Sequence, residues 1–121
     1  MKPKVLKNSF KYALAGIAYV WKHDQNIRFH ALASLVVIFA SIFFRVNPYE
    51  MGILGVMIVL VITTEMINSA IEKMVDLITV EHRVEAKVAK DVASGMVLIS
   101  SAGSVVVAIL IFLPYIYRIF V

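Results

Sequence analysis

Residues 51–76 read MGILGVMIVLVITTEMINSAIEKMVD, a long apolar run with polar side chains in its final third. At about 100° per residue, spacings of three, four and four place four of these side chains within an arc of roughly 80° on one helix face. This acidic stripe consists of Glu65, Asn68, Glu72 and Asp76. A carboxylate about fourteen residues into an apolar span costs roughly 3 kcal/mol or more to insert. Glu65 is therefore expected to face a cavity, a metal or a partner chain, and not lipid.

Composition points to an integral membrane protein. Of the 121 residues, 61% are hydrophobic and 17% are charged, and the mean hydropathy is +0.88. This length accommodates three spans of about 20 residues and a short amphipathic helix, so residues 1–121 are expected to form a single membrane domain. The absence of cysteine excludes disulfides and thiolate metal sites. No removable signal peptide is expected, because no compact apolar stretch with a small-residue cleavage site follows the basic N-terminus.

The first segment, about residues 4–23, is expected to be an amphipathic helix on the bilayer surface. Lys4, Lys7 and Lys11 share one face at helical spacing, and apolar side chains recur on the other: Leu6, Phe10, Ala13, Leu14, Ile17 and Trp21. Tyr19 and Trp21 suit an interfacial depth. A basic tail without defined geometry is the alternative, but a pattern sustained over nearly five turns favours the helix.

Three membrane spans are predicted, at about residues 27–46, 51–72 and 92–113. Asn47-Pro48 breaks the chain after the first span, residues 79–91 form the only long charged connection, and Pro114 with Tyr115 is expected to mark the end of the third span. Six of the twelve Lys and Arg residues precede the body of the first span and four lie between Lys73 and Lys90. The positive-inside rule therefore places the N-terminus and the charged connection in the cytoplasm and the C-terminus outside.

This topology brings six polar residues from three segments together near the cytoplasmic interface: Asp24, Glu65, Glu72, Asp76, Lys90 and Asp91. Carboxylate oxygens suit Mg²⁺, which usually takes one or two of them and completes its shell with water and substrate phosphates. Lys90 can meet a nucleotide phosphate as a point charge. Glu65 can accept a proton from an alcohol, because a poorly hydrated carboxylate is a stronger base. Together these roles describe phosphoryl transfer to a membrane-embedded hydroxyl.

Each residue also has a structural explanation. Asp76, Asp91, Glu81 and Glu85 can all belong to a solvated face that pairs with Arg83, Lys87 and Lys90. For Glu81 and Glu85 this explanation is favoured over a functional one. Glu72 can lie at a helix end with its carboxylate in water, and Asn68 and Ser69 can be interhelical hydrogen-bonding residues. His30 has too little context for a metal role. The small residues of the third span are more typical of close helix packing than of catalysis.

The acidic stripe and a segment at the start of the third span together form a recognisable pattern. The series Glu65-x-x-Asn68-Ser69-Ala70-Ile71-Glu72-x-x-x-Asp76, followed by Ala89-Lys90-Asp91-x-Ala93-Ser94-Gly95, resembles the prokaryotic diacylglycerol kinase and undecaprenol kinase family. The resemblance extends from Phe10-Lys11-Tyr12-Ala13-x-x-Gly16 through Asn26-x-Arg28-x-His30 to the third span. It implies an all-α bacterial inner-membrane protein, a homotrimer of three-span subunits with a surface helix and active sites shared between neighbours.

The resemblance also implies roles for the polar residues. Glu65 would be the general base that activates the lipid hydroxyl, and Glu72 would bind the Mg²⁺ carried by ATP. The nucleotide and catalytic surroundings would be organised by Asn68, Asp76, Lys90 and Asp91. The second metal-binding acid of the family is usually a glutamate, and Asp24 is one methylene shorter. Ala13 stands where some members place a serine near the nucleotide.

The family divides between two lipid acceptors, diacylglycerol and the polyprenol undecaprenol. The segment Asn26-Ile-Arg28-Phe-His30 looks more like members that phosphorylate undecaprenol, so undecaprenol is the preferred prediction and diacylglycerol the alternative. A small proton-coupled transporter also uses one intramembrane glutamate, but it would not need the acidic stripe to continue into a charged loop. A purely structural protein would rarely keep Glu65 in the span. No nucleic acid partner is expected.

Overall fold

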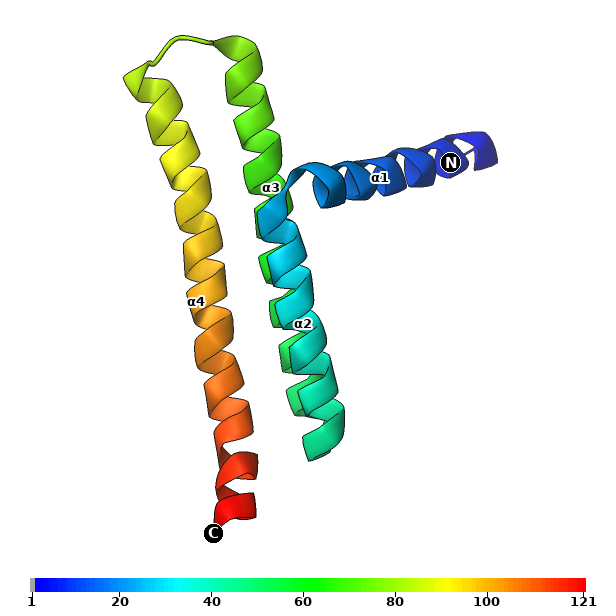
Figure 1. The fold of residues 1–121 in the computed structure, drawn as a ribbon. Coiled ribbons are helices and arrows are strands. Elements are labelled where there is room, and N and C mark those ends of the chain that lie inside the picture. Colours follow the sequence, from blue (N-terminus) through cyan, green and yellow to red (C-terminus); the bar gives the residue numbers. More distant parts are fainter. Residues whose placement is uncertain (1) are drawn as a thin grey trace.

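The computed structural model describes residues 2–121 as four helices (Figure 1). In chain order they are α1 (Pro3–His23), α2 (Gln25–Phe44), α3 (Pro48–Ile78) and α4 (Val84–Phe120). The last three run antiparallel to their chain neighbours in an elongated bundle, and α1 projects sideways from it. Each of α2, α3 and α4 is long and apolar enough to cross a membrane. The expected all-α architecture with three such helices is therefore confirmed.

A single residue, Asp24, separates α1 from α2. Its backbone is extended (φ −113°, ψ 108°), and its carboxylate caps α2 by accepting a hydrogen bond from the backbone N–H of Asn26 at 2.9 Å. Aspartate is among the preferred residues at this position, because it satisfies one of the free N–H groups of the first turn. Figure 1 shows a sharp change of direction between α1 and α2, which the helix bounds place at this residue.

The connection between α2 and α3 is shorter than a typical loop. Helix α2 ends at Phe44, so Arg45 and Val46 lie outside the helix although both fall within the first predicted span. Arg45 adopts the left-handed conformation (φ 53°, ψ 49°) that terminates helices. Helix α3 then begins at Pro48, with Asn47 and Glu50 forming a reciprocal capping box. The break predicted at Asn47-Pro48 thus coincides with the start of α3, whereas α2 already ends at Phe44.

Helix α4 differs most from the sequence-based expectation. It continues through Pro114 to Phe120, beyond Pro114 and Tyr115, where the third membrane span is predicted to end. Proline leaves only the carbonyl four residues earlier without its helical partner, and membrane helices tolerate such a loss. The charged connection is also shorter than expected, because residues 84–91 already belong to α4 and only 79–83 are non-helical. The Lys87–Asp91 ion pair, at i and i+4, supports this first part of α4.

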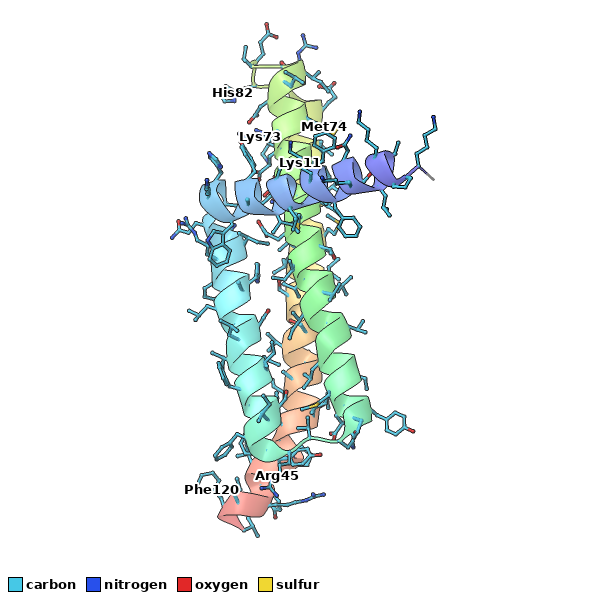
Figure 2. All side chains as sticks on the ribbon, turned by 90° about the vertical axis from the view of Figure 1, so that its right-hand side faces the viewer. Lys11, Arg45, Lys73, Met74, His82 and Phe120 are labelled. Carbon is cyan, nitrogen blue, oxygen red and sulfur yellow. The ribbon has the colours of Figure 1, made fainter. Side chains whose placement is uncertain are left out.

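The apolar core lies at the end of the bundle opposite the α3–α4 connection. Val46, Leu54 and Ile111 are buried there, with Phe44 and Tyr115 among the side chains packed against them. Figure 2 shows Arg45 and Phe120 at this end and His82 at the other tip, with Lys11 and Lys73 at the level of α1. Most large apolar side chains of the bundle are exposed in the isolated chain, as expected for helices that meet lipid or other membrane helices.

Candidate active site

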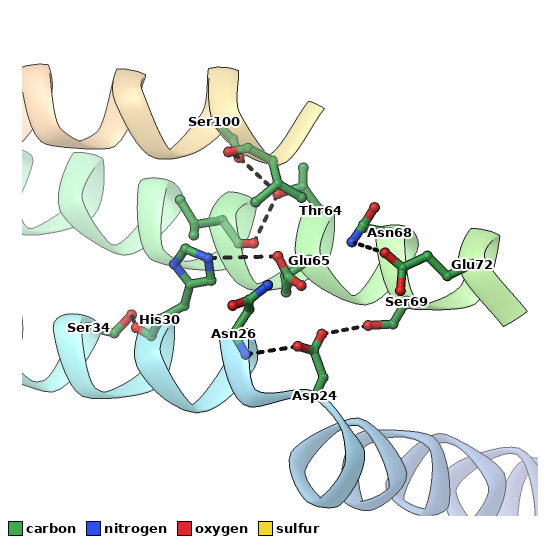
Figure 3. A network of polar contacts seen from close by, with 12 residues as sticks. Asp24, Asn26, His30, Ser34, Thr64, Glu65, Asn68, Ser69, Glu72 and Ser100 are labelled. Carbon is green, nitrogen blue, oxygen red and sulfur yellow. Dashed lines mark hydrogen bonds and ion pairs between the residues drawn. The ribbon is translucent and has the colours of Figure 1, made fainter. Parts of the chain in front are cut away.

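Glu65 is the most deeply buried large side chain of the described residues, with 2% of its surface exposed. It lies on α3, and the His30 side chain of α2 points toward it, with 3.8 Å between His30 Nε2 and Glu65 Oε2 (Figure 3). This burial confirms the expectation that Glu65 does not face lipid. A carboxylate held in this way has exchanged most of its water for protein neighbours.

Two polar pairs flank Glu65, one between helices and one within α3. The Thr64 and Ser100 hydroxyls are hydrogen-bonded at 2.9 Å, which ties α3 to α4. Asn68 Nδ2 donates to Glu72 Oε1 at 3.3 Å, so the acidic stripe is connected along its own helix. Asn68 Oδ1 is buried and has no hydrogen-bond partner in the described chain.

Asp24 connects the α1–α2 corner to α3. The Ser69 hydroxyl donates to Asp24 Oδ2 at 2.6 Å (Figure 3). Burial acts to raise the pKa of Asp24, but the side-chain contacts with Ser69 and Glu65 and the backbone N–H of Asn26 outweigh it and hold the pKa below its ordinary value. Asp24 is therefore an anion at neutral pH.

A polar pocket of about 210 Å³ lies between the end of α1 and α3. We call it the acidic pocket, and its lining consists of Tyr19, Val20, His23, Asp24, Ser69, Glu72, Lys73 and Asp76. The lining includes both acids predicted to bind metal, Asp24 and Glu72. Within residues 2–121, no three His, Cys, Asp or Glu side chains converge closely enough to hold a metal by themselves. Two carboxylates that share one pocket fit Mg²⁺, which usually completes its shell with water and phosphates.

The predicted nucleotide-binding residues divide between two neighbouring spaces. Lys90 Nζ contacts Asp76 Oδ1 at 2.7 Å, and Asp76 lines both the acidic pocket and a larger cavity of about 590 Å³ formed by the α3–α4 hairpin. Asp91 lines only the hairpin cavity and pairs with Lys87. The structure thus brings Asp24, Glu72, Asp76 and Lys90 together, whereas Glu65 lies deeper and Asp91 lies further out.

Sequence reasoning overlooked two of these contacts, because His30 was set aside and the Thr64–Ser100 pair was not anticipated. Ser69 was considered as an interhelical hydrogen-bonding residue, and its bond from α3 to Asp24 agrees with that reading, although Asp24 was not foreseen as the acceptor. A usable signal existed for His30, because a carboxylate within a span requires a polar partner, and His30 is the one imidazole inside the first predicted span.

The fold and the site together define a small helical membrane protein with a buried acid beside an open acidic pocket. Comparison with known proteins gives the family: residues 11–112 match the one described as prokaryotic diacylglycerol kinase. The chain belongs to this family of lipid kinases.

The matched relatives include both lipid kinase types. The chain is 37% identical to the undecaprenol kinase of Bacillus subtilis (strain 168) over 106 residues, covering 88% of this chain and 86% of the relative. It is 35% identical over 107 residues to a diacylglycerol kinase of Synechocystis sp., covering 88% of this chain but 61% of that relative. It is 31% identical over 95 residues to a diacylglycerol kinase of Haemophilus influenzae, covering 78% of this chain and 80% of the relative.

Proposed function

We propose that the protein phosphorylates the hydroxyl of a membrane lipid alcohol with ATP, and that its preferred acceptor is undecaprenol, giving undecaprenyl phosphate. Membership of the family supports the kinase class. The undecaprenol preference rests on the segment Asn26-Ile-Arg28-Phe-His30 and agrees with the relative from Bacillus subtilis, which is named undecaprenol kinase. Diacylglycerol is the competing acceptor, since other relatives are named diacylglycerol kinase.

One observation carries the proposal: Glu65 is buried on α3 about one helical turn from Ser69, which lines the acidic pocket. Ser69, which lines that pocket, follows Glu65 by four residues on α3, a rise of about 6 Å at 1.5 Å per residue. A lipid hydroxyl at the interface can therefore meet Glu65 from the membrane side, while phosphates enter the pocket from water. This arrangement suits transfer between a water-soluble donor and a lipid acceptor.

In the proposed reaction, a proton moves from the lipid hydroxyl to Glu65 and a phosphoryl group moves from ATP to the lipid. Glu65 accepts the proton of the lipid hydroxyl as the lipid oxygen bonds to the γ-phosphorus, and the bond from that phosphorus to the bridging oxygen of ATP breaks to release ADP. Such transfers depend chiefly on positioning and electrostatic stabilisation. Asn68 and Asp76 keep the catalytic surroundings in place, whereas Lys90 and Asp91 bind the nucleotide. Asp76 and Lys90 act together through their contact.

Asp24 and Glu72 are the residues that would hold Mg²⁺. A bound magnesium ion would neutralise charge on the ATP phosphates. Asp24 is already oriented by Ser69 and Glu72 by Asn68, so both carboxylates are held in position before any ligand enters. Because Asp24 also caps α2, it couples the metal site to the corner between α1 and α2.

We also propose a bacterial inner-membrane location with the N-terminus and the site in the cytoplasm. Helix α1 would lie on the membrane surface, since it has no buried residue in the isolated chain and exposes Phe10, Leu14 and Trp21. The subunit would assemble as a homotrimer. The broad exposure of apolar side chains on the bundle helices is consistent with contacts between subunits.

A transfer assay on detergent-purified protein tests the function. Radiolabelled MgATP is offered with undecaprenol and with diacylglycerol in separate reactions, and the lipid products are resolved. Label in undecaprenol supports the full proposal, whereas label in diacylglycerol alone supports the kinase and overturns the preference. Folded, oligomeric protein that labels neither lipid would contradict both acceptors.

A further inference from the structure

Acidic side chains outnumber basic ones around Glu65. Asp24 from the α1–α2 corner and Glu72 from α3 both lie close enough to affect Glu65 electrostatically, and both are acids. Asn68 adds a neutral amide from α3, and α4 contributes at this level the Ser100 hydroxyl, which is engaged with Thr64. Among residues 2–121, His30 is the only basic side chain within ion-pair distance of Glu65.

The environment of the His30 ring directs its polar edge toward Glu65. The ring packs edge-on against Phe29, with 5.9 Å between the ring centroids. It also lines a cavity of about 140 Å³ between α2, α3 and α4. The cavity walls are aliphatic apart from Met57 and two serines, Ser34 and Ser104. Glu65 is therefore the charged partner available to the imidazole.

We propose that His30 is a positioning residue for the Glu65 carboxylate, a role that rests on the proposed kinase function. With a proton on Nε2, the imidazole presents an N–H to Glu65 Oε2 across 3.8 Å. This restricts rotation of the carboxylate and leaves its other oxygen for the lipid hydroxyl. The separation exceeds that of a direct hydrogen bond, and such contacts in unliganded sites often tighten when substrate binds.

Two substitutions at the same site separate positioning from packing. His30→Phe keeps a ring of similar shape but removes the N–H, whereas His30→Gln loses the ring and keeps an N–H donor. If His30 positions Glu65, kcat for lipid phosphorylation falls by about a hundredfold in His30→Phe, the scale expected when a catalytic group is misplaced by about 1 Å. His30→Gln should recover part of this loss, and KM for MgATP should change little in either variant. The opposite order, with His30→Phe more active than His30→Gln, would overturn the proposal.

Ser34→Ala is the matched control on α2. Ser34 donates to the backbone carbonyl of His30 and also lines the cavity, so its loss disturbs the same turn without touching Glu65. We expect this variant to keep near-normal kcat. A loss as large as that of His30→Phe would assign the effect to general packing and contradict the positioning role.

A stability measurement tests the pairing without any assay of transfer. Replacing His30 alone leaves the buried Glu65 carboxylate unpaired, which is strongly destabilising, whereas replacing both partners removes the charge as well. His30→Phe should therefore lower the unfolding midpoint in detergent more in the native background than in the Glu65→Gln background. Equal shifts in both backgrounds would refute the pair. If the native protein labels no lipid, the proposed function fails, but this cycle still reports on the pair.

Discussion

Helix α3 carries three glutamates, and two of them, Glu50 in its first turn and Glu65 near its middle, have opposite surroundings. Glu50 accepts hydrogen bonds on Oε1 from the backbone N–H of Asn47 and from the Tyr115 hydroxyl. Its own backbone N–H donates to Asn47 Oδ1 at 2.8 Å. Glu65 instead is almost completely buried, and its nearest basic partner, His30, lies 3.8 Å away.

The comparison separates an acid that completes a structure from an acid that is available for chemistry. The carboxylate of Glu50 is engaged by a cap and by a neighbouring helix, so its contribution is to close the α2–α3 turn and fasten α4. Glu65 is desolvated and has few donors, which is the condition under which a carboxylate becomes an effective base. Glutamate therefore has two different roles on the same helix, because the hydrogen-bond donors around each carboxylate differ.

Removing the two carboxylates in turn gives the largest expected contrast. Glu65→Gln should reduce lipid phosphorylation by at least the roughly 10²- to 10⁴-fold that general base catalysis contributes, while MgATP binding persists. Glu50→Gln preserves shape and should leave kcat close to normal. Radiolabel transfer and nucleotide binding on both variants provide the measurement. Full activity in Glu65→Gln would remove the assigned base, and a matching loss in Glu50→Gln would erase the distinction between the two ends.

A second substitution tests whether Glu72 binds the metal. Glu72→Gln should raise KM for MgATP on the order of tenfold or more, the scale seen when metal-binding groups or their supports are lost, with a smaller effect on kcat. Titration with Mg²⁺ at fixed ATP should show a higher requirement for the metal. Glu85→Gln, an exposed acid at the start of α4, is the control. An unchanged Mg²⁺ requirement in Glu72→Gln would contradict the metal role.

At the opposite end, Tyr115→Phe removes the hydroxyl that Glu50 accepts but keeps the ring against the apolar core. We expect a loss of a few degrees in the unfolding midpoint and normal transfer activity, since this contact is remote from the site. Thermal unfolding in detergent and the lipid assay, run on the same preparation, measure both. Strongly impaired transfer would show that the two ends are coupled.

The smallest effect is expected for Ser100→Ala. This change removes the hydroxyl partner of Thr64 and so one bond between α3 and α4. Interhelical side-chain hydrogen bonds in membranes average about 0.6 kcal/mol, so the free energy of unfolding should fall by about that amount. Unfolding curves in a denaturing detergent, compared with those of Thr64→Val and the double variant, isolate the pair. Additive losses would show that the contact contributes nothing.

Periodicity was sufficient for the helices and for the acidic stripe. Composition and apolar length identified three spans, and the stripe placed Glu65 away from lipid, as its burial confirms. The ends of helices were less predictable. Pro114 lies within α4 because a membrane helix tolerates the loss of one backbone hydrogen bond. The charged residues after Arg83 are also helical, and the Lys87–Asp91 ion pair supports the helix there.

Contacts between helices were the least predictable part of the site. The Ser69–Asp24 and His30–Glu65 contacts join residues that are 45 and 35 positions apart. Both contacts depend on the position of α2 along α3. This position is set by the single-residue corner at Asp24 and by the tight turn at Arg45. The position of Glu65 in the span indicated that it needs a polar partner, but side-chain type alone did not specify either pairing. The roles of the site residues themselves stay predictions until the variants above are measured.

The tight turn between α2 and α3 also bears on how the chain enters the bilayer. With the proposed orientation, the tip formed by residues 45–50 has to cross the membrane during biosynthesis. Arg45 and Glu50 are its only formal charges, and they are of opposite sign. A membrane potential contributes about 2.3 kcal/mol per net elementary charge per 100 mV, so it does almost no net work on this tip. The tip can therefore cross the bilayer without net electrical work, and in the proposed orientation the Lys and Arg residues that remain on the cytoplasmic side hold the chain in place.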